Sequence, residues 1–66
     1  MNRIEHLRRL IEDPLLVTMP VNVFYLTGFR STNAALLVDG DRALLFSDFS
    51  YAEAGRKVEG VEFVEV

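Results

Sequence analysis

Two apolar runs separated by a short polar turn constrain the fold of this chain more than any other feature. Residues 34–38 read AALLV, residues 42–46 read RALLF, and Asp39-Gly40-Asp41 lies between them. Asp-Gly suits the positive φ angles of a tight turn, so the two runs are predicted to pair as a β-hairpin. Successive residues of both runs are apolar, which is typical of strands covered on both faces. The hairpin is therefore expected inside a sheet with both faces covered.

Residues 2–12 are predicted to form an amphipathic helix. Apolar side chains recur at helical spacing at Ile4, Leu7, Leu10 and Ile11. Asn2 and Glu5 fit a capping box at the start of this helix. Pro14 ends it, because proline disfavours helical geometry in the residue before it. The sequence thus predicts one helix with an apolar stripe that faces a core.

Proline and glycine set the elements between this helix and the hairpin. Residues 15–18 are predicted to form a short strand, apolar enough to be buried on both faces. Pro20 suits the first turn of a helix, and Gly28 suits the position after its last turn. A second helix is therefore expected over residues 20–26.

The chain after the hairpin is predicted to hold one helix and one strand. The helix begins near Ser50, where Ser50 and Glu53 fit a second capping box. The strand spans residues 61–66. The complete order is helix–strand–helix–strand–strand–helix–strand, which is typical of the α/β class, with a mixed sheet and helices packed against it.

The length of the chain limits it to one small domain. Chains of this size bury only about 60% of their unfolded surface, and this one has no cysteine to form disulfides. Oligomerisation or attachment to a larger protein usually supplies the missing stability. The last residue, Val66, stands in an apolar strand-like run, and an uncovered apolar edge strand invites aggregation. We therefore expect the chain to be a truncated part of a longer domain.

Composition excludes several classes of protein. The net charge of −3 provides no basic surface for nucleic acid or for an anionic membrane. The longest apolar run, residues 34–38, is too short to span a bilayer. The absence of cysteine rules out thiolate metal sites and a cysteine nucleophile. The expected location is the cytoplasm.

Few residues are candidates for catalysis. His6, the only histidine, falls on the polar side of the first helix without a metal-ligating neighbour, so a surface role is favoured. Asp39 and Asp41 flank the turn glycine and Asp48 precedes a helix, where aspartates usually serve the backbone. A small carboxylate nuclease would need all three to converge on metal ions. No catalytic and no metal-ligating residue is assigned in this chain.

Three segments carry a resemblance to a known family. Residues 20–29, PVNVFYLTGF, resemble the P-x-N-[VI]-x-Y-L-[TS]-G-[FY] signature of the creatinase/prolidase N-terminal domain. Residues 31–38, STNAALLV, are similar to its S-x-N-[AG]-x-L-[LV]-[VI] strand, and residues 43–51, ALLFSDFSY, to its strand that ends in T-D-x-R-Y. Ser50 replaces the arginine of that last motif, so no role of the arginine carries over.

The resemblance implies a ribonuclease-H-like mixed-sheet domain of which residues 1–66 are a part. This family's N-terminal domain precedes a metallopeptidase domain that binds two divalent metals (manganese, cobalt or zinc) through two Asp, one His and two Glu. That C-terminal catalytic domain is absent from these residues, so we expect the chain alone to be inactive. The implied parent is an Xaa-Pro aminopeptidase, Xaa-Pro dipeptidase or creatinase-like enzyme, and the sequence leaves these three open. Its substrates would be short Xaa-Pro peptides.

In this family the domain serves homo-oligomer assembly and limits access to the active site. By motif position the candidates for such contacts are Asn22, Tyr25, Phe29, Asp48 and Tyr51. Each has a structural alternative, because asparagine can satisfy backbone groups at a helix end and large aromatics also fill cores. A second hypothesis is a free-standing interaction module that pairs through its exposed edge strand.

Overall fold

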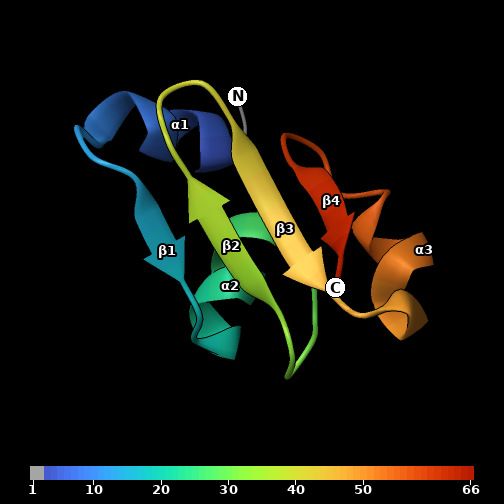
Figure 1. Ribbon diagram of the computed structural model, residues 1–66. Coiled ribbons are helices and arrows are strands. Elements are labelled where there is room, and N and C mark those ends of the chain that lie inside the picture. Colours follow the sequence, from blue (N-terminus) through green and yellow to red (C-terminus); the bar gives the residue numbers. More distant parts are fainter. Residues whose placement is uncertain (1–2) are drawn as a thin grey trace.

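The computed structural model describes residues 3–66 as a four-stranded sheet with helices on one side (Figure 1). Its elements, in order, are α1 (Arg3–Leu10), β1 (Leu15–Val17), α2 (Pro20–Thr27), β2 (Ala35–Val38), β3 (Ala43–Ser47), the 3₁₀ helix η1 (Phe49–Tyr51), α3 (Ala52–Gly55) and β4 (Glu62–Glu65). The predicted order of helices and strands and the mixed α/β class are confirmed. No described helix is long and apolar enough to cross a membrane.

The sheet is mixed and its strands follow the order β1-β2-β3-β4. The first three strands pair antiparallel, whereas β3 and β4 are parallel. A parallel pair needs a crossover, and η1 with α3 provides it. The predicted hairpin is confirmed, with Val38 opposite Ala43 on either side of the turn.

Asp39 holds the hairpin turn through its carboxylate. Its Oδ1 accepts hydrogen bonds from the backbone N–H groups of Asp41 at 2.8 Å and Arg42 at 2.7 Å. These two backbone donors hold the pKa of Asp39 below its ordinary value. The prediction that this aspartate serves the backbone is confirmed.

The register separates the side chains of the sheet into two faces. One face packs against the helices and forms the core with Ile4, Val23 and Phe29. Its strand residues in the core cluster are Leu36, Val38, Ala43 and Leu45. The other face, called the open face below, consists of Leu16, Ala35, Leu37, Leu44, Phe46, Glu62 and Val64.

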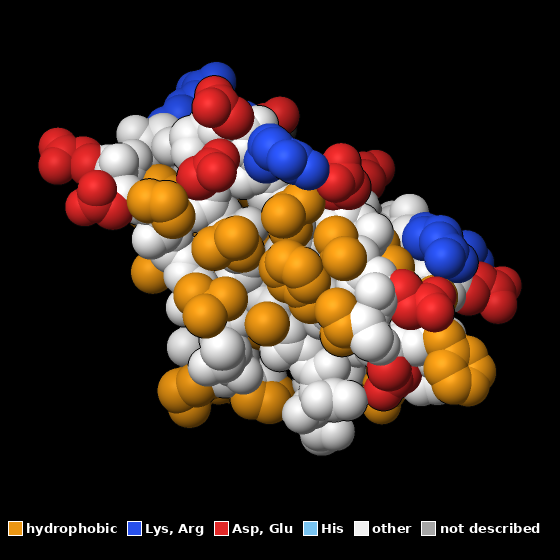
Figure 2. All heavy atoms as spheres, viewed as in Figure 1, with side chains coloured by type: hydrophobic (Ala, Val, Ile, Leu, Met, Phe, Trp, Pro, Cys, Tyr) orange, Lys and Arg blue, Asp and Glu red, His pale blue; other side chains and the backbone are white. Residues whose placement is uncertain are grey.

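Only one face of the sheet is covered within residues 3–66. Helices α1 and α2 lie behind the sheet in the view of Figure 1. Figure 2, from the same side, shows apolar side chains gathered across the front of the sheet. None of the open-face residues belongs to the core or packs against it. The expected coverage of both faces is therefore wrong for the described residues.

Strand β1 is an exposed edge strand. Leu15 and Leu16 are 39% and 60% exposed, although the sequence predicted a strand buried on both faces. The prediction failed because β1 pairs with β2 alone. Val17, on the helix face, packs against the core.

The helices differ from prediction mainly at their ends. Asn2 of the predicted capping box lies outside the described residues, and α1 ends at Leu10, whose side chain is 68% exposed and off the buried stripe. Helix α2 ends one residue later than predicted. Gly28 follows it with φ of 76° and donates its N–H to the Phe24 carbonyl at 2.7 Å, as a C-terminal stop should.

The crossover after β3 begins with a different cap from the one predicted. Asp48, not Ser50, is the N-cap residue, and the chain first forms η1 and then the short α3. An aspartate in extended geometry accepts N–H bonds more readily at this position than the serine already inside the turn. Gly55 of α3 packs directly on the Phe63 ring, where a Cβ atom would overlap the ring.

Candidate functional site

The structure distributes the five candidate residues over three places. Asn22 and Tyr25 line a surface groove, Phe29 and Tyr51 form an aromatic pair at the core, and Asp48 caps η1. The candidates therefore do not form one site.

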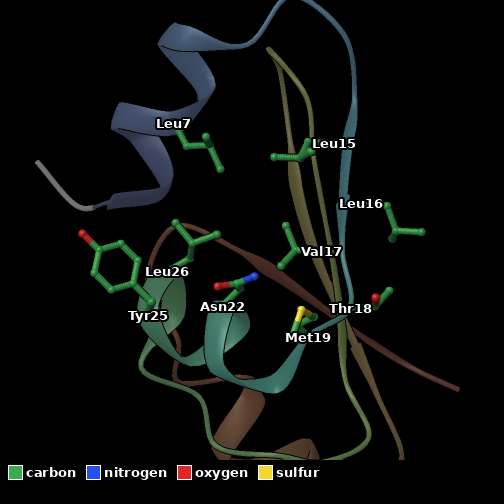
Figure 3. Close-up of a pocket in the computed structure, with 9 residues that line it drawn as sticks. All are labelled: Leu7, Leu15, Leu16, Val17, Thr18, Met19, Asn22, Tyr25 and Leu26. Atoms are coloured by element: carbon green, nitrogen blue, oxygen red, sulfur yellow. The ribbon is translucent and has the colours of Figure 1, made fainter.

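The groove lies between α1, α2 and the edge strand β1 (Figure 3). It has a volume of about 400 Å³. Its lining residues are Leu7, Leu15, Leu16, Val17, Thr18, Met19, Asn22, Tyr25 and Leu26. In Figure 3 the side chains of Leu7, Val17 and Leu26 point into the space between the two helices and the strand. The groove is thus mainly apolar, with β1 backbone at one wall.

Asn22 is the polar side chain of α2 that points toward β1 in Figure 3. The side chain is exposed, and its carboxamide forms no hydrogen bond with any residue of the range 3–66. An asparagine carboxamide offers two donors and one acceptor. The alternative that Asn22 only satisfies backbone groups at the helix end has no hydrogen bond to support it.

Tyr25 lies on the surface beside the groove and not in the core. Its side chain is 60% exposed, and the Arg3 guanidinium stacks over its ring at 4.3 Å. Arg3 Nη1 also donates to the Tyr25 carbonyl oxygen at 3.0 Å. The pair fixes the ring at the surface, with a cation–π contribution of about 0.5–1 kcal/mol at such an exposed site.

Phe29 and Tyr51 pack against each other at the core. Phe29 is 4% exposed and belongs to the core cluster. Its ring meets the Tyr51 ring edge-to-face, with 5.9 Å between centroids and 72° between planes, the geometry that aromatic pairs prefer. A buried ring cannot contact a substrate or a second subunit. In this structure Phe29 is therefore a core aromatic and not a contact residue.

Asp48 organises the start of the crossover. Its Oδ1 accepts hydrogen bonds from the hydroxyl and the backbone N–H of Ser50, and its Oδ2 accepts one from Asn33 Nδ2 at 3.1 Å. The Ser50 hydroxyl is the main cause that holds the pKa of Asp48 below its ordinary value of 3.8. Asn33 and the Ser50 N–H act in the same direction.

We expect Asp48→Asn to lower the urea midpoint of unfolding at neutral pH. A folded-state pKa below the unfolded one stabilises the fold above the unfolded pKa, and this contribution is lost as pH falls through the folded pKa. The difference in urea midpoint between the variant and the original chain should therefore shrink below the ordinary pKa of 3.8.

Urea titrations at pH 7 and at about pH 3 measure this difference in midpoint. Asp13→Asn, at an exposed position, is the matched control. A difference that persists unchanged in acid would contradict the account.

The residues from 3 to 66 contain no group of three His, Cys, Asp or Glu side chains close enough to hold a metal ion. His6 is exposed on α1. Asp39 and Asp48 are each engaged by backbone donors in separate turns. The described residues therefore do not fit a two-metal centre.

Sequence reasoning missed the apolar lining of the groove. Three large apolar side chains of this lining, Leu16, Met19 and Tyr25, are at least 59% exposed. The signal was present, because α2 is apolar almost all round and a helix of that kind needs a second contact.

The family profile of the creatinase/prolidase N-terminal domain matches residues 3–66, almost the whole chain. The chain belongs to the creatinase/prolidase N-terminal domain family. This creatinase/prolidase N-terminal segment is 35% identical to the "Uncharacterized peptidase YqhT" of Bacillus subtilis over 68 aligned positions, which cover 96% of the chain and 19% of that protein.

Two solved structures share its fold. An Xaa-Pro aminopeptidase structure from Streptococcus pyogenes matches with a TM-score of 0.88 at 35% identity, over 97% of this chain and 54% of that one. The aminopeptidase P structure from Streptococcus thermophilus matches with a TM-score of 0.79 at 35% identity, over 97% and 52%. The creatinase/prolidase N-terminal segment therefore spans about a fifth of the curated relative and about half of the solved chains.

Proposed function

We propose that these residues are the front part of the non-catalytic N-terminal domain of an Xaa-Pro peptidase. The match of residues 3–66 to the family carries this proposal, and the two solved relatives are named as aminopeptidases of Xaa-Pro specificity. Catalysis would belong to a C-terminal metallopeptidase domain with two divalent metal ions. Its substrates would be short Xaa-Pro peptides and its location the cytoplasm.

We expect the 66-residue chain alone to hydrolyse no Xaa-Pro dipeptide, even with added manganese. Metal-activated attack by water needs several carboxylate or histidine ligands around the metal, and the described residues bring no such group together. An assay for the release of free proline measures the hydrolysis of the dipeptide. Metal-dependent turnover by the pure chain would contradict the proposal that catalysis belongs to a separate C-terminal domain.

We further propose that the groove between α1, α2 and β1 is the surface through which the domain acts in oligomerisation and in control of access to the active site. Asn22 and Tyr25 of the signature segment both line it. Their side chains are exposed and are not part of the core. Tyrosine and methionine are enriched at protein interfaces, and Tyr25 and Met19 both line the groove.

In the longer enzyme, we expect Tyr25→Ala to weaken subunit association and to raise cleavage of longer peptides relative to Xaa-Pro dipeptides. Aromatic anchors at the centre of interfaces contribute about 2 kcal/mol or more, so the association constant should fall at least about tenfold. Light scattering and a peptide-length series measure the two effects. Phe49→Ala removes an aromatic ring that is 77% exposed outside the groove and should change neither. Equal effects of the two variants would contradict the role of the groove.

A further inference from the structure

A second cavity lies beside the loop that joins α2 to β2. The antiparallel pairing of β2 with β3 places this loop and the start of the crossover at the same end of the sheet (Figure 1). The cavity, called the Arg30 basin below, is lined by Pro20, Val21 and Phe24 of α2, by residues 30–32 of the loop and by Tyr51 of η1. Its volume of about 550 Å³ lies within the range of small-ligand sites. No residue of the basin lines the groove, so the two are separate surfaces.

Arg30 is the charged member of the basin. Its guanidinium carbon lies 4.7 Å from the centre of the Phe24 ring, and a guanidinium over the face of a ring keeps N–H donors free at its edge. No hydrogen bond or ion pair with a residue of the range 3–66 uses these donors. Arg56 also lies over a ring, but it pairs with Glu65 at 3.8 Å. Among the described residues, Arg30 therefore has no carboxylate partner.

The positive charge of Arg30 is not neutralised by a carboxylate in the lining of the basin. Asp48 stands at the start of the same crossover, but its two carboxylate oxygens accept hydrogen bonds from Ser50 and Asn33. The basin therefore attracts an anionic group. A guanidinium holds a carboxylate through two parallel N–H···O bonds, which gives the contact both strength and direction.

The rest of the lining is apolar or carries hydroxyl groups. Val21 and Phe24 are 65% and 40% exposed although both are apolar. The hydroxyls of Thr32 and Tyr51 form no hydrogen bond with any other residue that the structure describes, and a hydroxyl can both donate to and accept from an amide group. The basin thus suits a ligand with a carboxylate, an apolar side chain and an amide.

The walls of the basin are held in place by the fold. Phe29, which precedes the loop, is buried in the core and meets the Tyr51 ring edge-to-face. At the other end of the loop, Asn33 Nδ2 donates to Asp48 Oδ2 at 3.1 Å, and the Asn33 carbonyl accepts a hydrogen bond from the Ser47 hydroxyl at 3.0 Å. A site whose walls are already ordered loses less free energy when a ligand binds.

We propose that the Arg30 basin binds the free C-terminal carboxylate of a short peptide whose last residue is apolar. Arg30 holds the carboxylate, and the last side chain of the peptide lies against Val21 and Phe24. The hydroxyls of Thr32 and Tyr51 take the last amide group. The proposal goes beyond the proposed function, because it requires neither the groove nor a catalytic domain. Either one can therefore fail while the other stands.

An NMR titration of the 66-residue chain tests the proposal with three probe peptides. The first is N-acetyl-alanyl-leucine with a free carboxylate, and the second is its C-terminal amide, which lacks the charge. The third, N-acetyl-alanyl-glutamyl-alanine amide, carries its carboxylate on an internal side chain. The backbone N–H signals of residues 30–32 and 51 and the Nε–H signal of Arg30 report on the basin. Arg30→Gln removes the anchor, and Arg56→Gln is the matched control, because Arg56 is also exposed and lies over the Phe63 ring outside the basin.

The free acid should shift the signals of the basin and saturate, whereas the amide and the glutamyl peptide should bind at least about tenfold more weakly, because they lose the charged contact in the basin. Arg30→Gln should weaken binding of the free acid by a similar factor, and Arg56→Gln should leave it unchanged.

Equal binding of the acid and its amide would overturn the proposal, and so would unchanged binding by the Arg30→Gln variant. Equal binding of the glutamyl peptide would assign the basin to acidic side chains of a partner protein and would also overturn it. If the 66-residue chain gives no spectrum of a folded protein, the same titrations decide in a chimera in which residues 3–66 replace the matched half of the Streptococcus pyogenes chain.

Discussion

Leu45→Ala should leave the 66-residue chain largely unfolded at room temperature. Leu45 is 0% exposed at the centre of β3, within the core cluster. Truncation of such a leucine removes about 2–5 kcal/mol of folding free energy. The single core of a domain of this size rarely supplies more than about 3–5 kcal/mol of stability. Urea unfolding followed by far-UV circular dichroism measures the loss.

Leu44→Ala is the matched control for Leu45→Ala. It makes the same change at the neighbouring residue, which points to the open face and is half-buried. Because no layer covers it, the expected loss is about 1 kcal/mol or less. Equal losses for the two variants would contradict the assignment of the two faces of the sheet.

Phe29→Ala should have an effect of similar size, a loss of about 3–5 kcal/mol. The ring is 4% exposed and meets Tyr51 edge-to-face. Its removal would leave a cavity where the end of the signature segment joins the core. The effect therefore belongs to stability and should appear in the isolated chain, without any partner or substrate. Thermal and urea unfolding measure it.

Phe49→Ala separates burial from the loss of an aromatic ring as such. Phe49 is 77% exposed in η1, so the same change there should alter stability by no more than about 0.5 kcal/mol. If Phe29→Ala were equally mild, the ring would not be the core residue that the structure describes.

The hairpin could be predicted from the sequence because its signals are local. Asp-Gly between two apolar runs fixes the turn chemistry and the pairing at once. The end of α2 could also be predicted to within one residue, since Gly28 adopts the positive φ angle that glycine tolerates at a helix end. The order of elements followed from such local signals.

The burial of β1 and of the open face could not be predicted, because burial depends on which elements pack together. Leu15 and Leu16 are as apolar as core residues, yet they lie on an edge strand. The apolar residues of β2 and β3 indicated two covered faces, but residues 3–66 supply cover for one. Which faces of a sheet are covered is a tertiary feature that local patterns do not locate.

The sequence predicted which segment holds the candidate residues, but not which of its side chains form a site. The signature directed attention to residues 20–29, but periodicity did not show which side chains face outward. The structure places Phe29 in the core and Asn22 and Tyr25 at the groove. The groove itself depends on the approach of β1 to α2, which are separate elements in the sequence.

Sequencing the gene downstream of the codon for Val66 tests the central claim most directly. The account predicts an open reading frame that completes the N-terminal domain and continues into a domain with spaced Asp, Asp, His, Glu and Glu residues. A stop codon directly after Val66 would contradict it. The chain would then be a free-standing module, and its exposed edge strands β1 and β4 would be the surfaces through which it pairs with a partner.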